Sequence, residues 1–482
     1  MKLKKYKLGD LCFPDKIGIY GIPASAEDFS EDKIRYLRIS DISDDGILLD
    51  NDKKSVTDKD IDKYILEEND MVFARTGNST GRAYLYDSND GILAFAGFLI
   101  KYQLDETKVN PKFVRYFTIS EYYKQWVKNL SVGSTRGNIS AQSFADCPIL
   151  LPSRKQQDCT VKILSYIDRK IAINRAINQN LEAMAKQLYD YWFVQFDFPN
   201  EEGKPYKSSG GAMVWNDKLK REIPALWEIK MIDNVADVYN GATPSTANEQ
   251  NYGGDFVWIT PKDLSDQKQK FVYQGERNIS QAGYNSCSTH LLPPNTILMS
   301  SRAPIGLLSI AKAELCTNQG FKSFVPKVEN ITTYLYYYLQ IHIKQIEQLG
   351  TGTTFKEVSR EDVLRFPILK PSDNVLGLWE ERVAALNDKQ LEIQKENENL
   401  TKQRDELLPL LMNGQVSVNS DLSALIIYHL NLLLKVCLIL LFSDILSSSM
   451  SCKSNSSIRY LRLGLTAVIL QRMAWLVFSC RR

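Results

Sequence analysis

The 482-residue sequence lacks the residue clusters that metal sites and disulfide frameworks require. Its eight cysteines are scattered without a CxxC pair, and none of the three histidines lies near a cluster of cysteines. A zinc site or a set of disulfides is therefore not expected, and this use of cysteine fits a reducing compartment, the cytoplasm. The basic first residues lead into no apolar run, so we also expect no signal peptide.

Motifs for nucleotide and nucleophile chemistry are missing as well. The sequence contains no GxxxxGK(S/T) phosphate loop, no GxGxxG turn after a predicted strand, and no Asn/Asp-Pro-Pro motif flanked by an aromatic residue. The histidines have no serine or cysteine context that would indicate a catalytic triad. One short match to a metal-nuclease pattern, Asp217 with Glu228-Ile-Lys230, lies at the entry to a predicted domain and is interpreted as coincidental. The sequence therefore predicts a protein that is not an enzyme and that holds no metal or cofactor of its own.

Charge is nearly balanced over the whole chain but not along it. The formal net charge is +2, and the residues after Ser420 are basic, so the rest of the chain is slightly acidic. Overall charge therefore does not support nucleic-acid binding, and such a site would have to be a local patch.

The segment after Ser420 differs in composition from everything before it. Its two apolar runs, residues 422–442 and 463–478, are interrupted by polar or charged residues. Neither run reaches the roughly 18 uncharged apolar residues expected of a membrane helix. We therefore expect no membrane association and interpret the segment as a foreign extension, such as the product of read-through or of another reading frame. A membrane anchor is the alternative interpretation.

Residues 153–192 are predicted to form one long helix. Apolar and helix-compatible residues recur there in alternating steps of three and four, which is the seam spacing of a coiled coil. Adding 219 to each seam number gives a second stretch with the same steps, so that Leu164 corresponds to Val383 and Asn178 to Asn397. Buried polar residues at such positions fix the register at some cost in stability. The predicted seam residues are Leu164, Ile167, Ile171, Asn178, Leu181, Leu188, Val383, Leu386, Ile393, Asn397, Leu400 and Leu407, with Asn174 as a further polar member.

The segments that precede the two helices are also copies of each other. In both, β-rich runs broken by turn residues predict strands. The offset of 219 relates Ser140 to Ser359 and Pro148 to Pro367, and residues 317–321 repeat the pattern of residues 94–98. The chain is thus predicted to be a tandem of one globular domain and one long helix, repeated once.

Polar residues on the loops of both copies are the candidate DNA contacts. Glycine lets the backbone approach a ligand closely, arginine reads guanine in the major groove, and asparagine or glutamine reads adenine. An ordinary surface turn is the simpler interpretation of any one of these residues. The same loops recur in both copies with different side chains, however, which is expected of two domains that read two different sequences. The candidates are Arg75, Thr76, Asn78, Arg82, Ser134, Thr135, Arg136, Asn138, Ser301, Arg302, Asn318, Gln319, Thr353, Thr354 and Lys356.

Several stretches resemble the specificity subunit of type I restriction-modification systems. Arg221-Glu-Ile-Pro-Ala-Leu-Trp-Glu228, followed by Asn240-Gly-Ala-Thr-Pro-Ser245, is similar to the family's entry into its second recognition domain. Tyr191-Trp-Phe-Val-Gln-Phe-Asp197 and Leu407-Leu-Pro-Leu-Leu-Met-Asn-Gly414 look like the ends of its central and distal helices. The resemblance spans roughly residues 6–415. The tail and the arginine-poor glycine loop of the second copy depart from the family pattern.

The resemblance implies an α+β fold in which two similar target recognition domains are joined by two long, antiparallel, coiled-coil-like helices. Each domain would read one half of a bipartite double-stranded DNA target. The helices, each of about 40 residues and therefore roughly 60 Å long, would act as a spacer. They would also dock two modification subunits, which carry S-adenosylmethionine, and restriction subunits would join through these. The predicted divisions are a first recognition domain over residues 1–152, the central helix over 153–198, a linker over 199–220, a second recognition domain over 221–371, the distal helix over 372–414, and an atypical hydrophobic and basic extension over 415–482.

Two alternatives to a working recognition subunit stay open at the level of sequence. A self-sufficient restriction-modification enzyme would require a methyltransferase motif and a nuclease core, which the sequence does not contain. A silent or defective specificity cassette would carry a foreign tail that prevents assembly, and the composition after Ser420 is the evidence for it.

Overall fold

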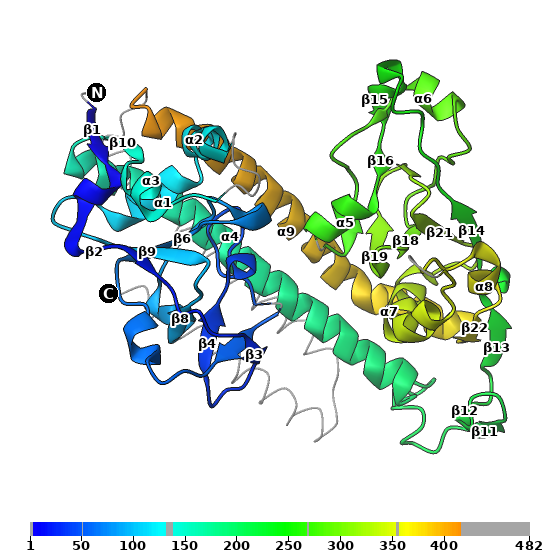
Figure 1. The fold of residues 1–482 in the computed structure, drawn as a ribbon. Coiled ribbons are helices and arrows are strands. Elements are labelled where there is room, and N and C mark those ends of the chain that lie inside the picture. Colours follow the sequence, from blue (N-terminus) through cyan, green and yellow to red (C-terminus); the bar gives the residue numbers. More distant parts are fainter. Residues whose placement is uncertain (1–2, 51, 132–137, 268, 353–355, 416–482) are drawn as a thin grey trace. The chain divides into compact units, whose positions relative to one another are not determined.

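A computed structural model describes residues 3–50, 52–131, 138–267, 269–352 and 356–415 (Figure 1). The chain divides into two compact units, unit 1 with residues 1–167 and 404–482 and unit 2 with residues 168–403. The boundaries fall inside the two long helices, α4 (Arg154–Tyr189) and α9 (Asp373–Met412). Each unit therefore combines one globular domain with part of both helices. The predicted α+β fold class is confirmed.

Two four-stranded sheets form most of the β-structure described in unit 1. The order of the first is β2-β9-β6-β7, and that of the second is β3-β5-β4-β8. Neighbouring strands are antiparallel except for β4 and β8. A separate antiparallel pair, β1 with β10, brings the start of the domain beside the residues that lead into α4. The elements are β1 (Lys4–Lys7), β2 (Cys12–Tyr20), β3 (Glu27–Asp28), β4 (Ile34–Leu37), β5 (Lys54–Val56), β6 (Asp70–Ala74), β7 (Ala83–Leu85), β8 (Leu93–Phe95), β9 (Leu99–Leu104), β10 (Pro148–Leu151), α1 (Pro111–Thr118), α2 (Glu121–Ser131) and α3 (Ala141–Ala145).

Unit 2 contains a five-stranded sheet with the order β14-β21-β18-β19-β17. Its strands are antiparallel except that β17 runs parallel to β19. Smaller pairs are formed by β11 with β12, β13 with β22, and, in parallel, β16 with β20. The elements are β11 (Met213–Asn216), β12 (Arg221–Pro224), β13 (Glu228–Met231), β14 (Ala236–Asn240), β15 (Tyr252–Phe256), β16 (Trp258–Ile259), β17 (Phe271–Val272), β18 (Ile297–Ser301), β19 (Ile305–Ala311), β20 (Cys316–Thr317), β21 (Phe321–Pro326), β22 (Pro367–Lys370), α5 (Pro261–Gln267), α6 (Gln281–Asn285), α7 (Thr332–Gln348) and α8 (Arg360–Leu364).

The two globular domains share one topology. The order β2-β9-β6-β7 in unit 1 has the same chain logic as β14-β21-β18-β19 in unit 2, and β1–β10 matches β13–β22. The parallel pair β4–β8 likewise matches β16–β20. In both units a serine hydroxyl caps the short helix before the last strand: Ser140 accepts from the amide of Ser143, and Ser359 accepts from that of Asp362. The chain is therefore an internal repeat in three dimensions as well as in sequence.

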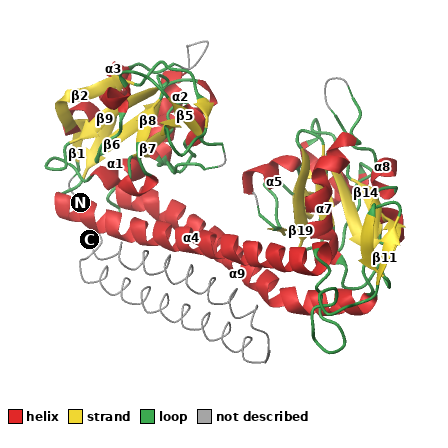
Figure 2. Cartoon of the chain, turned by 90° about the horizontal axis from the view of Figure 1, so that it is seen from below, coloured by secondary structure: helices red, strands yellow, loops and turns green. Residues whose placement is uncertain are grey.

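The two long helices lie side by side (Figure 2), and seam residues make contacts between them. In unit 2, the Asn174 side chain donates to Glu396 at 2.7 Å, and the Asn178 and Gln390 side chains each donate to the other residue's carbonyl at 3.4 Å. Residue numbers rise on one helix as they fall on the other, so the helices run antiparallel there. Leu164, Ile167, Ile171, Leu181, Val383 and Ile393 are buried, whereas Asn178, Leu188, Leu386, Asn397, Leu400 and Leu407 are half-buried.

In unit 1 the helices are part of the core of the globular domain. Leu164 of α4 is fully buried in one apolar cluster with Leu408 and Leu411 of α9 and with Phe113 of α1. Polar contacts reinforce this packing, since the amide of Asn110 donates to the Gln157 side chain at 2.9 Å. Complete burial of a leucine side chain contributes about 2 kcal/mol, so these helix residues help to hold the domain together.

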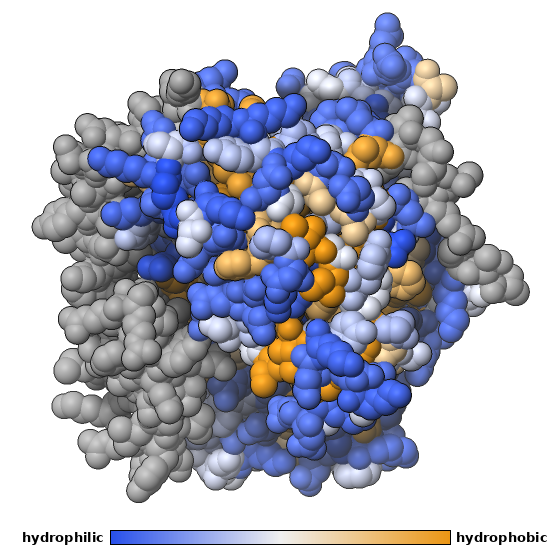
Figure 3. Space-filling model, turned by 60° about the vertical axis from the view of Figure 1, so that its left-hand side comes forward, coloured by the Kyte–Doolittle hydropathy of each residue, from blue (hydrophilic) through white to orange (hydrophobic). Residues whose placement is uncertain are grey.

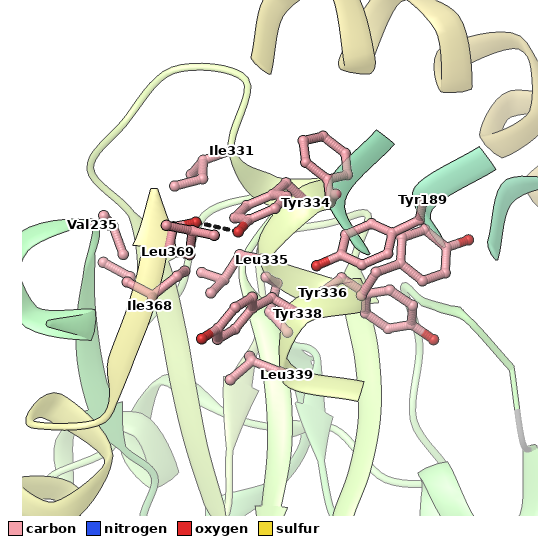
Figure 4. Close-up of a cluster of buried hydrophobic side chains, with 14 of the residues drawn as sticks. Tyr189, Val235, Ile331, Tyr334, Leu335, Tyr336, Tyr338, Leu339, Ile368 and Leu369 are labelled. Carbon is pink, nitrogen blue, oxygen red and sulfur yellow. Dashed lines mark hydrogen bonds between the residues drawn. The ribbon is translucent and has the colours of Figure 1, made fainter. Parts of the chain in front are cut away.

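An aromatic core closes the far end of α4 in unit 2. Beyond Tyr189 the helix continues as a π-helical turn, Asp190–Val194, and Phe193 lies 4.7 Å from Tyr334 and 5.0 Å from Trp379 between ring centroids. Figure 4 shows Tyr189 beside α7 and the hydroxyl of Tyr334 donating to the carbonyl of Leu369. The helix end is thus anchored in the second globular domain.

Part of the segment predicted as a linker, residues 199–220, packs on this core, through Tyr206, Met213 and Leu219. Tyr206 stacks on Phe198 with ring centroids 4.6 Å apart, and the amide of Ser208 donates to Asp197 at 2.8 Å. The segment also carries β11, which forms a hairpin with β12. The composition of the segment did not predict the ring stacking and the hydrogen bond, because within it only Tyr206 and Ser208 make them.

On the face drawn in Figure 3, hydrophilic side chains cover most of the described surface and apolar ones form patches between them. Among the described helices, none is both long enough and apolar enough to cross a membrane. The predicted extension lies outside the described residues from residue 416 onward.

Candidate nucleic-acid interface

Four chain segments of unit 1 meet at one end of the sheet β2-β9-β6. Tyr20 is the last residue of β2, Arg75 follows β6, Phe98 precedes β9, and Ile139 precedes α3. The amide of Arg75 donates to the carbonyl of Phe98 at 3.0 Å, and the amide of Ile139 donates to the carbonyl of Arg75 at 2.9 Å. These backbone bonds hold the segments together at the sheet end, which we call the unit 1 loop face.

Unit 2 builds the same backbone arrangement at the matching sheet end. The amide of Ser301 donates to the carbonyl of Gly320 at 2.8 Å, and the amide of Val358 donates to the carbonyl of Ser301 at 3.1 Å. Ser301 therefore occupies the position of Arg75, and Gly320 that of Phe98. We call this end of the sheet the unit 2 loop face.

This equivalence corrects the sequence alignment by one residue. The similarity in sequence between residues 94–98 and 317–321 places Gly97 opposite Gly320. The hydrogen bonds place Phe98 opposite Gly320 instead. The shared Gly-Phe dipeptide is coincidental, because the backbone pairing, and not the side-chain identity, sets the register of a sheet.

One glycine in each unit is required by close backbone approach. A Cβ atom added to Gly21 would lie 2.2 Å from the carbonyl oxygen of Ala96, and one added to Gly241 would lie 2.1 Å from that of Asn318. Both contacts are far shorter than real Cβ contacts. The turn after the first sheet strand thus needs glycine in both domains.

Arg75 is presented on an aromatic ring. Its guanidinium carbon lies 5.0 Å from the ring centroid of Tyr20, and its Nε atom is buried without a hydrogen-bond partner among the described residues. The hydroxyl of Tyr20 in turn accepts from the amide of Ala141 at 3.4 Å. Arg75 is therefore positioned by stacking, and its buried Nε atom has no acceptor among the described residues.

The other predicted residues of this loop differ from Arg75 in their surroundings. Arg82 is held by Asp44 at 2.7 Å and by the carbonyl of Ile42 at 3.1 Å, which gives it a structural role in the loop. Thr76 is half-buried, and Asn78 is exposed on a short 3-10 turn. Within this loop, Asn78 is thus the exposed member, and Arg75, which is half-buried, is the arginine without a side-chain hydrogen bond to a described residue.

Where unit 1 carries Arg75, the unit 2 loop face carries a cluster of ion pairs, one carboxylate with two cations. The Ser301 side chain is fully buried, so the prediction that it contacts DNA is corrected to an internal position. Beside it, Glu357 lies 3.2 Å from the buried Lys322 and 3.8 Å from Arg302. By the same pairing, Glu357 occupies the position of Asn138 in unit 1. The carboxylate is an acceptor where unit 1 offers an amide.

The remaining predicted residues of unit 2 lie around this cluster. Asn318 is half-buried and accepts from the amide of Gly320 at 2.9 Å, which occupies its amide oxygen. Gln319 is exposed and accepts from the hydroxyl of Thr243. Lys356 is exposed.

Asn138 is exposed next to Ile139, so it lies at the unit 1 loop face. Five predicted contacts fall outside the described residues: Ser134, Thr135, Arg136, Thr353 and Thr354.

Three residues at these faces were not predicted from the sequence: Tyr20, Phe98 and Glu357. Tyr20 and Phe98 are 42% and 60% exposed, which is unusual for side chains of this size beside buried strands. Their signal in the sequence was an aromatic residue next to a glycine, as in Tyr20-Gly21 and Gly97-Phe98. Glu357 was missed because only the structure brings it beside Lys322.

Comparison with known proteins identifies the family. The profile described as "Type I restriction modification DNA specificity domain" matches residues 2–183 and 224–402, well over half of the chain and once for each repeat. The HindI specificity subunit of Haemophilus influenzae is 26% identical over 415 residues, covering 73% of this chain and 88% of that protein. The MjaIX specificity subunit of Methanocaldococcus jannaschii is 38% identical over 164 residues, which is 33% of this chain and 38% of that protein.

Among solved structures, the type I restriction-modification S subunit from M. genitalium aligns over 85% of this chain and 96% of its own, with 16% identity and a TM-score of 0.48. The family assignment rests on the two profile matches, each of which coincides with one globular domain and the start or body of one long helix. The chain therefore belongs to the family of type I restriction-modification DNA specificity subunits.

Proposed function

We infer that this chain is the DNA-sequence-recognition subunit of a type I restriction-modification complex and that its two domains read the two halves of a split target. As a member of its family, the chain recognises DNA and is not itself an enzyme. The observation that carries the finer proposal is the repeated loop face. One backbone framework occurs twice, and the side chains displayed on it differ.

The chemistry of the two faces supports two different half-sites. The unit 1 loop face displays Arg75, a donor that suits guanine, with Asn138 beside it, a side chain that suits adenine. The unit 2 loop face carries Glu357 between Lys322 and Arg302, and a carboxylate accepts from the amino group of cytosine. Two faces with different donor and acceptor sets would bind an asymmetric sequence.

The helix pair is proposed to set the gap between the half-sites and to dock the partners. Helices of 36 and 40 residues are roughly 54 and 60 Å long. Exposed residues on their outer faces, such as Arg175 and Lys395, would contact two modification subunits. Those subunits would carry S-adenosylmethionine and the methylation chemistry, and restriction subunits would join through them.

Methylation mapping tests this function directly. A host that expresses this chain with its modification subunit should acquire methylated adenines within a split motif of fixed gap. The control is the same host with the modification subunit alone, which should show no such motif. A continuous motif would contradict two independent readers.

Complex formation with the modification subunit separates the alternative of a silent cassette. The residues after Ser420 are the observation that favours it, because their composition differs from that of the repeat. If the full chain forms no complex with the modification subunit but a chain that ends at Asn419 does, the tail prevents assembly and the cassette interpretation holds. If both form the complex, that interpretation is rejected.

A further inference from the structure

We propose that Arg75, held on the ring of Tyr20, reads a guanine in the half-site of unit 1, with Tyr20 as the positioning residue. The inference rests on the proposed function and names the base that this face selects. At the position of Arg75, unit 2 carries Ser301, which is fully buried.

The hydrogen-bonding state of Arg75 supports the proposal. A guanidinium carries five N–H donors in a rigid plane. The Arg75 side chain makes no hydrogen bond or ion pair with a described residue, and its Nε atom is buried. Nε is the one guanidinium nitrogen of Arg75 that is buried without a partner, so the terminal Nη groups of this half-buried side chain are the donors that a ligand with acceptors would satisfy.

Arg75 differs in its hydrogen-bond partners from Arg82, which lies seven residues further along the same segment. Arg82 is satisfied by Asp44 at 2.7 Å and by the carbonyl of Ile42 at 3.1 Å. Sequence alone treated the two arginines as equivalent. In the structure, Arg82 is bonded within the loop, whereas Arg75 lies over the ring of Tyr20.

The ring of Tyr20 supports the guanidinium of Arg75. Tyr20 is 42% exposed, its ring lies 5.0 Å from the guanidinium carbon, and its hydroxyl accepts from the amide of Ala141 at 3.4 Å. The ring limits the directions in which the guanidinium plane can point, and stacking on a ring face does not use the in-plane N–H groups of the terminal nitrogens. Phe98, 60% exposed and joined to Arg75 by a backbone hydrogen bond, adds an apolar edge to the same face.

The donors of Arg75 match the acceptors of guanine better than those of adenine. Guanine displays two acceptors, N7 and O6, side by side in the major groove, and a planar bidentate donor matches this pair. Adenine presents one acceptor and one donor, so the same arginine would leave a donor facing a donor. The fixed guanidinium therefore selects guanine at one position.

The test uses the complete chain in complex with its modification subunit and duplexes that contain the motif found by methylation mapping. The half-site of unit 1 is the one that changes when residues 1–152 are exchanged for those of another family member. Each guanine of that half-site is replaced in turn by 7-deazaguanine, which keeps base pairing but lacks the N7 acceptor. One such replacement should weaken binding of the wild-type complex by roughly 5- to 150-fold.

Variants then assign the effect to the proposed residues. In Arg75→Ala, the sensitive 7-deazaguanine duplex and the natural duplex should bind equally. The variant should lose discrimination at that one base position and keep the wild-type discrimination at the other positions. Tyr20→Phe should keep the discrimination because it keeps the ring, whereas Tyr20→Leu should reduce it. A merely structural role of Tyr20 would instead weaken binding to all duplexes equally. Arg221→Ala is the matched control, because that arginine also lies over an aromatic ring, 4.4 Å from the centroid of Phe196, but outside the loop faces.

The outcomes separate this inference from the proposed function. If the wild-type complex methylates no split motif, the proposed function fails. If it does, but no guanine in the unit 1 half-site is sensitive, or the sensitivity persists in Arg75→Ala, only the arginine reader is overturned. Should Arg75→Ala melt at a clearly lower temperature than wild type, the comparison of Tyr20→Phe with Tyr20→Leu decides by the same measurement.

Discussion

Lys270 is a buried cation at the contact between the second globular domain and the helix pair. Its Nζ atom lies 3.1 Å from Glu182 of α4, 2.8 and 3.3 Å from Asn387 and Gln390 of α9, and 2.7 Å from the hydroxyl of Tyr337 of α7. Burial lowers the pKa of Lys270, and the charge of Glu182 opposes that shift. One side chain thus ties three helices to the start of β17.

Replacing Lys270 by methionine should destabilise the protein by about 3 kcal/mol, because it leaves Glu182 half-buried without its counter-charge. Urea unfolding of the full chain measures the change. The double variant Lys270→Met with Glu182→Gln should recover part of the loss, since no buried charge then remains.

Lys389→Met is the matched control on α9. Its partner Glu392 lies at 2.9 Å, but that side chain is 68% exposed, and exposed pairs contribute less than about 1 kcal/mol. Equal losses in Lys270→Met and Lys389→Met would show that burial of the pair does not matter.

At the scale of elements, the helix pair is held by different contacts along its length. In unit 1 the helices share an apolar cluster with the globular domain, whereas in unit 2 amide and ion-pair contacts join them directly. Asn174 is almost fully buried and donates to Glu396, which Lys170 also contacts at 3.1 Å. The amide oxygen of Asn397, in contrast, is buried without a partner among the described residues.

The two asparagines should therefore respond in opposite directions to leucine. Asn397→Leu removes an unsatisfied buried acceptor and should raise the free energy of unfolding by about 1 kcal/mol. Asn174→Leu breaks a satisfied hydrogen bond and leaves Glu396 with one partner fewer, so it should lower it by about 1–2 kcal/mol. Thermal unfolding by circular dichroism checks both, and a stabilising Asn174→Leu would mean that the bond to Glu396 contributes nothing.

At the scale of the whole molecule, each unit contains its own globular core and its own end of the helix pair. The apolar cores of the two loop-face sheets belong to different units. A change inside one loop face is therefore expected to leave the fold of the other unit intact.

Exchanging residues 1–152 for those of another family member should change one half-site of the methylated motif and leave the other half-site and the gap unchanged. Exchanging residues 221–371 should change only the other half. Methylome sequencing of both hybrids makes the comparison. A hybrid in which both half-sites change would show that the domains do not read independently.

Much of the repeat could be predicted from the sequence because periodic patterns record local physics. Steps of three and four place Leu164, Ile171 and Leu181 on one face of a helix, and that face is buried in the structure. The offset of 219 held at the short helix before the last strand, where Ser140 and Ser359 are the caps.

The loop faces needed tertiary structure, because their chemistry depends on residues that are distant in sequence. By itself, the sequence determined the tandem order and the long helices, since these follow from periodicity and the fixed offset, and its resemblance to a known family implied the α+β class. Only the tertiary structure distinguished Arg75 from Arg82, moved Ser301 inside and brought Glu357 to Lys322. The reason is physical: whether a polar side chain is free or satisfied is decided by the partners that folding places around it.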